Sequence, residues 1–186
     1  MRTRCFAVFL MLTLFSTVSL AGKNKVIYTD EAPAPAPGAY SQAIQSGNSI
    51  FVAGQLPLEF YYDTADSPPT PPLGCDGNEE DAREDADCWI LDVNSTTQQQ
   101  TTTVLNNIEA ILAAAKPPRN LCDITMATVY LNSSANSADF NSTYVARFAD
   151  CDNPPARATI TNVGIPKNAL LEISVIITTY PLSFFP

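Results

Sequence analysis

Two charged residues stand among small and apolar neighbours near the end of the chain, Arg157 in ARATIT (156–161) and Glu172 in LEISVII (171–177). Both segments have the alternation and the β-branched residues that predict strands, and we expect a hairpin over 153–177. An arginine can bind a carboxylate through two parallel hydrogen bonds, and a nearby glutamate can position or deprotonate water. The pair therefore indicates either a site for a carboxylate ligand or a salt bridge on a solvated sheet, which is the commoner arrangement.

Side-chain alternation sorts these two strands into faces. One set is apolar and is expected to pack against helices: Ala158, Ile160, Leu171, Ile173, Val175 and Ile177. The other set is polar: Arg157, Thr159, Thr161, Glu172 and Ser174. We therefore expect Arg157 and Glu172 to project together from the face that the helices leave uncovered.

The remaining elements must position this pair. Local patterns predict, in order, a strand at 25–29, a hairpin at 43–55, a helix at 95–115, a strand at 123–131 and a helix at 138–149. The order β-ββ-α-β-α-ββ predicts an α+β domain, a single mixed β-sheet with two helices on one face. Helical spacing assigns Val104, Leu105, Ile108, Ile111 and Leu112 to the inner face of the first helix, and Phe140, Tyr144, Val145 and Phe148 to that of the second. Alternation places Ile124, Met126, Thr128 and Tyr130 on one face of the middle strand, with Thr125, Ala127, Val129 and Leu131 on the other.

The N-terminus has the features of a signal peptide. Arg2 and Arg4 precede an apolar stretch at 6–15 that is too short to span a bilayer, and the small residues Ser19 and Ala21 follow at the positions −3 and −1 from the expected cleavage site. A retained anchor is the alternative reading. We expect residues 1–21 to be removed, which leaves one domain, 22–186, that is secreted or lies in the lumen of the secretory pathway. No other stretch is long and apolar enough to indicate attachment to a membrane.

Four cysteines remain after cleavage, an even number in an oxidising compartment. A helix that runs back along the strand before it brings Cys151 close to Cys122, which predicts a Cys122–Cys151 disulfide. The second predicted bridge is then Cys75–Cys88, a local clasp. A zinc site is the alternative, but the chain has no histidine and no CxxC pair, so we expect no metal.

Residues 59–93 form a predicted loop rich in proline and aspartate. This segment holds eleven acidic residues and one arginine, and the whole chain has a net charge of −9. Such a surface disfavours nucleic-acid binding, and its carboxylates lack the spacing of a calcium loop. Among three glycosylation sequons, Asn94 and Asn132 lie in predicted loops and are favoured, whereas we expect Asn141 to be unused.

Several stretches resemble a known family. They include APAPGAYSQAI (34–44), IFVAGQLPL (50–58), QTTTVLNNIEAILAAA (100–115) and PPARATITNVGIPKNALLEISVI (154–176), the last being the most specific. The chain resembles the YjgF/RidA family of reactive-intermediate deaminases. This resemblance implies a chorismate-mutase-like fold and a homotrimer whose sheets form a central barrel with three sites between subunits. It also implies hydrolysis of enamines and imines such as 2-aminoacrylate and 2-iminobutanoate to 2-oxo acids and ammonia, without a cofactor or metal.

The resemblance also implies roles for individual residues. Arg157 matches the arginine that binds the substrate carboxylate, Glu172 the glutamate that activates water, Tyr40 a tyrosine that lines the pocket, and Asn141 an asparagine near it. Two positions depart from the family pattern: Ala53 replaces a frequent serine at the pocket edge, and Thr159 a frequent cysteine.

Two other functions stay open. A non-catalytic secreted trimer could bind a partner through its acidic loop, as the long insertion and Ala53 would allow. Ribonuclease activity is the less favoured alternative, because the acidic charge and the absence of histidine argue against it.

Overall fold

The computed structural model describes residues 24–36, 38–60 and 86–178. The predicted signal peptide, most of the acidic insertion and Cys75 lie outside these residues. Within them, none of the helices combines the length and the apolar character that crossing a membrane requires.

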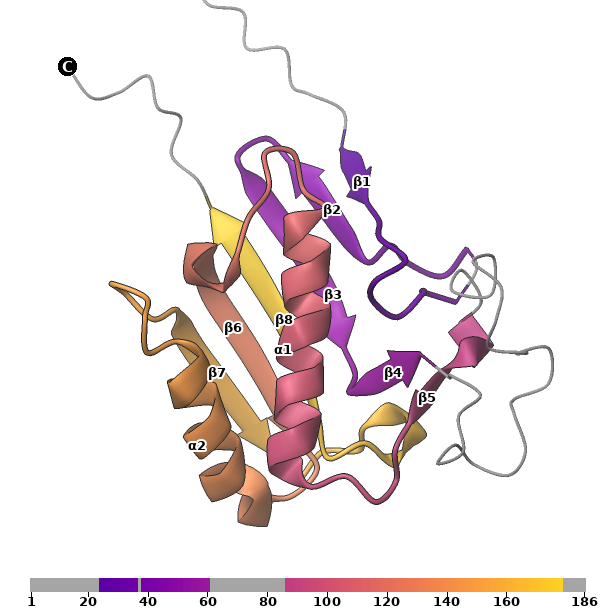
Figure 1. The fold of residues 1–186 in the computed structure, drawn as a ribbon, viewed down its shortest axis with the longest axis vertical. Helices are drawn as coiled ribbons and strands as arrows, with labels where there is room; N and C mark the ends of the chain where they lie inside the picture. Colours follow the sequence, from indigo (N-terminus) through magenta and orange to yellow (C-terminus); the bar gives the residue numbers. More distant parts are fainter. Residues whose placement is uncertain (1–23, 37, 61–85, 179–186) are drawn as a thin grey trace, which may run out of the picture.

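Six strands form one mixed sheet in the order β1-β2-β3-β8-β6-β7 (Figure 1). The strands are β1 (Lys25–Ile27), β2 (Ala43–Ser46), β3 (Ser49–Gln55), β6 (Ile124–Leu131), β7 (Ala156–Thr161) and β8 (Leu171–Thr178). All neighbouring pairs are antiparallel except β6 and β7, which are parallel. The predicted α+β class is therefore confirmed.

Two helices, α1 (Thr97–Ala113) and α2 (Ser137–Arg147), lie side by side on one face of this sheet (Figure 1). A capping box between Thr96 and Gln99 begins α1. The predicted inner face of α1 is buried throughout. On α2, Phe140, Tyr144 and Phe148 are buried, but Val145 is 64% exposed, so its prediction is wrong. Val145 follows Tyr144 directly, and about 100° of helical rotation turns it towards solvent.

The predicted hairpin over 153–177 is wrong as well. β7 and β8 do not pair, because β6 lies between them and pairs with both. The units β6, α2 and β7 form a crossover in which the helix returns the chain to the same end of the sheet, so that β7 runs parallel to β6. β8 then enters the sheet between β3 and β6.

The faces of β6 follow the prediction from Met126 onwards. Ala127, Val129 and Leu131 are buried against the helices, and Met126, Thr128 and Tyr130 lie on the other face. Ile124 is also buried, whereas Thr125 is exposed, contrary to prediction. A register shift against β8 between Ile124 and Met126 reverses the alternation at this point.

The ends of the predicted loop 59–93 pair as a small second sheet of β4 (Leu58–Phe60) and β5 (Trp89–Leu91). A satellite core of Leu58, Phe60, Cys88 and Trp89 supports it. Asn107 of α1 donates side-chain hydrogen bonds to the carbonyls of Leu56 and Leu58 at 3.2 and 3.0 Å. The insertion therefore leaves from a base that is fixed to α1.

The predicted Cys122–Cys151 disulfide is present, with a Cα–Cα distance of 5.3 Å. It ties the start of β6 to the chain just after α2. Cys88 is also in a disulfide, and its predicted partner, Cys75, lies outside the described residues.

Candidate functional site

Arg157 lies on the side of the sheet that the helices cover. Its register partner on β6 is Ala127, a core residue, and its guanidinium carbon lies 4.7 Å from the ring centroid of Tyr144 and 5.2 Å from that of Phe140. The guanidinium also donates a 2.8 Å hydrogen bond to the side-chain oxygen of Asn141. Because β7 is an edge strand, the side chain is held from one side and open to solvent on the other.

The charge of Arg157 is not neutralised by any carboxylate among the described residues, where the ion pairs are Arg147–Glu109 and Arg119–Asp123. A guanidinium has five N–H donors, and the bond to Asn141 uses one. Thr159, two positions along β7, is exposed on the same face. This arrangement can bind a carboxylate ligand.

Aromatic rings stack beneath the guanidinium. The centroids of Phe140 and Tyr144 are 5.2 Å apart, and those of Tyr144 and Phe148 are 4.6 Å apart. The hydroxyl of Tyr144 is buried and lacks a hydrogen-bond partner among the described residues. Burial raises the pKa of Tyr144 to about 12, against a smaller opposing effect of the Arg157 charge. The phenol is therefore neutral at physiological pH.

Glu172 lies on the opposite, uncovered face, beside Tyr130 of β6. It lines a pocket of about 380 Å³. The other lining residues are Tyr130, Val163, Gly164, Ile165 and Ser174. Loss of hydration raises the pKa of the Glu172 carboxyl above its ordinary value of 4.5. A carboxylate with a raised pKa is a stronger base, which suits it to accept a proton from water.

The wall of this pocket belongs to the connection between β7 and β8. Three residues of this connection have left-handed backbone conformations, Asn162, Lys167 and Asn168, with φ of 61°, 56° and 59°. The ammonium of Lys167 donates a 3.1 Å hydrogen bond to the carbonyl of Trp89. This bond joins the connection to the base of the insertion.

The carboxylate of Glu172 also contacts the backbone of Gly54. A β-carbon added at Gly54 would overlap the Glu172 Oε1 atom. The register of β3 against β8 shifts here, between Val52 and Gln55, so that Ala53 and Gly54 form a bulge. The sequence did not single out Gly54, although a glycine inside a strand pattern is a signal of close backbone approach.

The sequence predicted that Arg157 and Glu172 project from the same face of the sheet, and this prediction is wrong. They lie on opposite faces with β6 between their strands, because β7 pairs with β6 and not with β8. Two strand spacings and three residues along the strand place their Cα atoms roughly 14 Å apart. Tyr40 precedes β2, near the other edge of the sheet, and is 56% exposed.

The structure thus brings the predicted residues together in two groups. Arg157, Asn141 and Thr159 form one cluster on the helix side, which is suited to bind an anion. Glu172, with Ala53 in the adjacent bulge, forms a second cluster on the uncovered face. The contribution of the Phe140 and Tyr144 rings to the first group was missed. Phe140 and Tyr144 stand on either side of Asn141 in the sequence of α2, and this spacing could have indicated that the rings and the amide contact the same arginine.

The sequons have different surroundings. Asn94 is exposed just before α1. Asn132 is half-buried and accepts a 2.7 Å hydrogen bond from the side chain of Asn136. Asn141 bonds to Arg157. Glycosylation at Asn94 and Asn132 stays a prediction.

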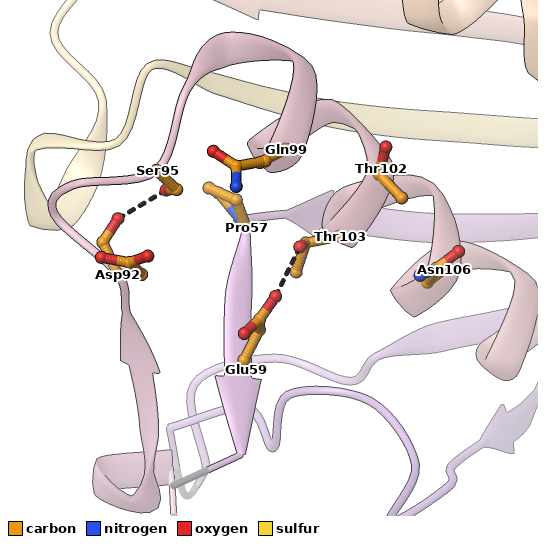
Figure 2. A pocket seen from close by; sticks show the side chains of 8 residues that line it. All are labelled: Pro57, Glu59, Asp92, Ser95, Gln99, Thr102, Thr103 and Asn106. Carbon is orange, nitrogen blue, oxygen red and sulfur yellow. Dashed lines mark hydrogen bonds between the residues drawn. The ribbon is translucent and has the colours of Figure 1, made fainter. Parts of the chain in front are cut away.

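A second pocket, of about 320 Å³, lies between the first turns of α1 and β4 (Figure 2). Its lining residues are Pro57, Glu59, Asp92, Ser95, Gln99, Thr102, Thr103 and Asn106. Glu59 accepts a 2.8 Å hydrogen bond from Thr103, and the carbonyl of Asp92 accepts one of 2.5 Å from Ser95. Two carboxylates without a basic residue in the lining would repel an anionic ligand, so this pocket is unsuited to a carboxylate substrate.

Metal ligands do not gather in the described ranges: no group of three or more His, Cys, Asp or Glu side chains is placed to hold an ion there.

Comparisons with known proteins identify relatives of this chain. The family model described as Endoribonuclease L-PSP matches residues 90–179. A RutC family protein of Sulfurisphaera tokodaii is 36% identical over 152 residues, which cover 82% of this chain and 96% of that protein.

Solved structures match over a similar span. The Rid family protein YyfA of Yersinia pestis has a TM-score of 0.63 and 29% identity, and the match covers 84% of this chain and 99% of that one. RidA of the Antarctic bacterium Psychrobacter sp. PAMC 21119 has a TM-score of 0.60 and 28% identity, over 83% and 99% of the two chains. Together with the arrangement of sheet and helices, these similarities show that the chain belongs to the YjgF/RidA family, which includes the RutC family proteins.

Proposed function

We propose that this protein hydrolyses 2-imino acids to 2-oxo acids and ammonia, at a site that Arg157 of one chain and Glu172 of a neighbouring chain form together. The observation that carries the proposal is the open guanidinium of Arg157, held by an amide and two rings with no carboxylate partner among the described residues. The described residues therefore leave this guanidinium open to the carboxylate of a substrate.

The proposed chemistry uses the two groups in different roles. Arg157 binds the substrate carboxylate and fixes the position of the imine carbon. Glu172, whose pKa is raised, takes a proton from a water as the water oxygen bonds to that carbon. The proton passes to the nitrogen, which gives a carbinolamine. The hydroxyl proton of the carbinolamine then moves to the nitrogen by way of Glu172, the carbon–nitrogen bond breaks as the carbon–oxygen double bond forms, and ammonia leaves the 2-oxo acid. An enamine substrate first takes a proton on carbon to become the imine.

A site shared between chains follows from the separation of the two groups. One chain presents them on opposite faces of its sheet, so a single small substrate cannot contact both. The uncovered face supports assembly, because it carries a row of apolar register partners on five neighbouring strands. These residues are Val26, Ile44, Phe51, Ile176 and Met126. Val26, Phe51 and Ile176 are 64%, 47% and 37% exposed in the single chain. A homotrimer would bury this row.

Secretion belongs to the proposal as well. It rests on the signal-like residues 1–21 and on the disulfide Cys122–Cys151, a bond that persists in oxidising compartments. Gel filtration and light scattering of the mature protein, and sequencing of its N-terminus from culture medium, would test assembly and export.

Activity is tested with 2-iminobutanoate generated in situ from 2-aminobutyrate by an amino-acid oxidase. Semicarbazide traps the surviving imine, and we expect the protein to lower the semicarbazone signal. Arg157→Ala and Glu172→Gln should remove most of this effect, whereas Arg147→Ala should retain it. An unchanged signal with folded wild-type protein would overturn the proposal.

A mixing experiment tests the shared site. Arg157→Ala and Glu172→Gln chains are unfolded, combined in equal amounts and refolded. If a site takes one residue from each of two chains, about a quarter of the sites in random oligomers regain both. A mixture as inactive as its components would show that the two residues act within one chain.

A further inference from the structure

Tyr144 takes no part in the bond-making and bond-breaking steps of the proposed reaction, but it contacts the residue that binds the substrate carboxylate. Its ring is the nearer of the two rings beside the Arg157 guanidinium, 4.7 Å from centroid to guanidinium carbon against 5.2 Å for Phe140, and its exposed fraction is 5%. A cation within about 6 Å of an aromatic face is attracted to it. The ring therefore limits the positions that the guanidinium can take, while the Asn141 oxygen fixes its orientation.

The hydroxyl of Tyr144 does not take part in this support. It is buried without a hydrogen-bond partner among the described residues, and its raised pKa, about 12, keeps it neutral. A phenylalanine at this position would keep the ring and lose no hydrogen bond to the described residues. The ring and the hydroxyl can therefore be separated by mutation.

The ring also has a matched neighbour. Phe148 lies in the same stack, 4.6 Å from Tyr144, and is buried to nearly the same extent, 4% against 5% exposed. It follows Tyr144 by four positions along the helical stripe, on the side away from Phe140, and Arg157 lies over Phe140 and Tyr144. Removing the Phe148 ring disturbs the stack without removing the surface under the guanidinium.

We propose that Tyr144 is a positioning residue whose ring, and not its hydroxyl, holds Arg157 ready for the substrate carboxylate. This inference rests on the proposed function for the identity of the ligand. The ring acts through Arg157 on substrate binding and does not touch the reacting carbon. Its removal should raise KM and leave kcat nearly unchanged, because anchoring the carboxylate serves ground state and transition state alike.

The test measures the binding of 2-oxobutanoate, the carboxylate product, to the mature protein by titration calorimetry, together with kcat and KM for 2-iminobutanoate. We expect Tyr144→Leu to bind 2-oxobutanoate about three- to tenfold more weakly than wild type. Tyr144→Phe should restore the affinity to within about twofold. Phe148→Leu should lose as much thermal stability as Tyr144→Leu and keep the wild-type affinity.

The outcomes separate the two proposals. Wild-type protein that binds no 2-oxobutanoate and destroys no imine would overturn the proposed function. If wild-type protein and Tyr144→Leu bound 2-oxobutanoate with equal affinity, the inference about the Tyr144 ring would be overturned and the proposed function would stand. Equal losses in Tyr144→Phe and Tyr144→Leu would assign the effect to the hydroxyl, and equal losses in Tyr144→Leu and Phe148→Leu would assign it to the stack. Either result contradicts the inference.

Discussion

Arg147, the last residue of α2, and Arg157, on the neighbouring strand β7, both donate a hydrogen bond to an asparagine, yet the charges around them differ. Arg147, at the end of α2, donates to Asn106 at 2.7 Å and forms a 2.8 Å ion pair with Glu109 of α1. Arg157 donates to Asn141 at 2.8 Å, but aromatic rings occupy the place that a carboxylate takes beside Arg147.

The difference separates a structural arginine from a binding arginine. The chain satisfies the charge of Arg147 and uses it to join two helices. The part of the chain that the structure describes holds Arg157 in place without neutralising it, so the guanidinium keeps its attraction for the carboxylate of a ligand. The predictions below test this contrast.

The largest effect is expected for Arg157→Ala. Loss of the charged hydrogen bonds to the substrate carboxylate should lower kcat/KM for 2-iminobutanoate roughly ten- to a hundredfold, with little change in the free energy of unfolding. Arg147→Ala is the control and should keep its kcat/KM. Steady-state kinetics of both variants measure this difference. A similar loss of activity in the two variants would contradict the distinction between a structural Arg147 and a binding Arg157.

Asn141→Asp should give Arg157 a carboxylate partner within the chain, like the one that Glu109 provides for Arg147. A carboxylate at this position would pair with the guanidinium and compete with the substrate, so we expect KM to rise about tenfold while kcat changes little. Asn141→Ala removes the hydrogen bond without adding charge and should raise KM less. If the alanine variant had the higher KM, orientation by Asn141 would matter more than the free charge of Arg157.

Local patterns in the sequence predicted which segments form strands and helices, but they did not predict which strands are neighbours in the sheet. Alternation identified β7 and β8 correctly, and it identified Leu171, Ile173, Val175 and Ile177 as core residues. It carries no information about pairing partners, and a nine-residue connection can form a long turn or cross a neighbouring strand. The strand–helix–strand order of β6, α2 and β7 was the signal for a parallel pair.

The position of Arg157 was harder to predict, because β7 is an edge strand. Ile160 has the apolar character of a core residue, but it lies on the uncovered face and is 37% exposed. Arg157 lies on the helix side, where rings of α2 accommodate its charge. Polarity therefore indicated the wrong face for both residues. The disulfide Cys122–Cys151 was predictable because it needed only the direction of α2 along β6.

A smaller effect is expected on stability from Arg147→Ala. Its ion pair is partly exposed, with side-chain exposures of 27% and 49%, and such pairs contribute about 0.5–1 kcal/mol. We expect the free energy of unfolding in urea to fall by this amount, and less at high salt. Glu109→Gln should give a similar loss. A loss above about 2 kcal/mol would mean that the exposed-pair description of Arg147 is wrong.

The smallest effect extends the comparison to the uncovered face, where Glu172 is an acid whose charge is disfavoured by burial. Its folded pKa lies above the ordinary 4.5, so the carboxylate costs the folded state stability once the pH exceeds 4.5, and the cost is complete above the folded pKa. Glu172→Gln should therefore be more stable than wild type at pH 7 and equal to it below pH 4.5.

Urea unfolding between pH 4 and 8 measures this difference, and it is best followed on single chains at low protein concentration, because assembly would change the surroundings of Glu172. Among the described residues that line this pocket, Glu172 is the only one with a carboxyl group, so the change can be assigned to Glu172. A glutamine variant less stable than wild type at pH 7 would show that the carboxylate is stabilised in the folded chain. Glu172 would then resemble the satisfied Arg147 and would be a weaker base than proposed.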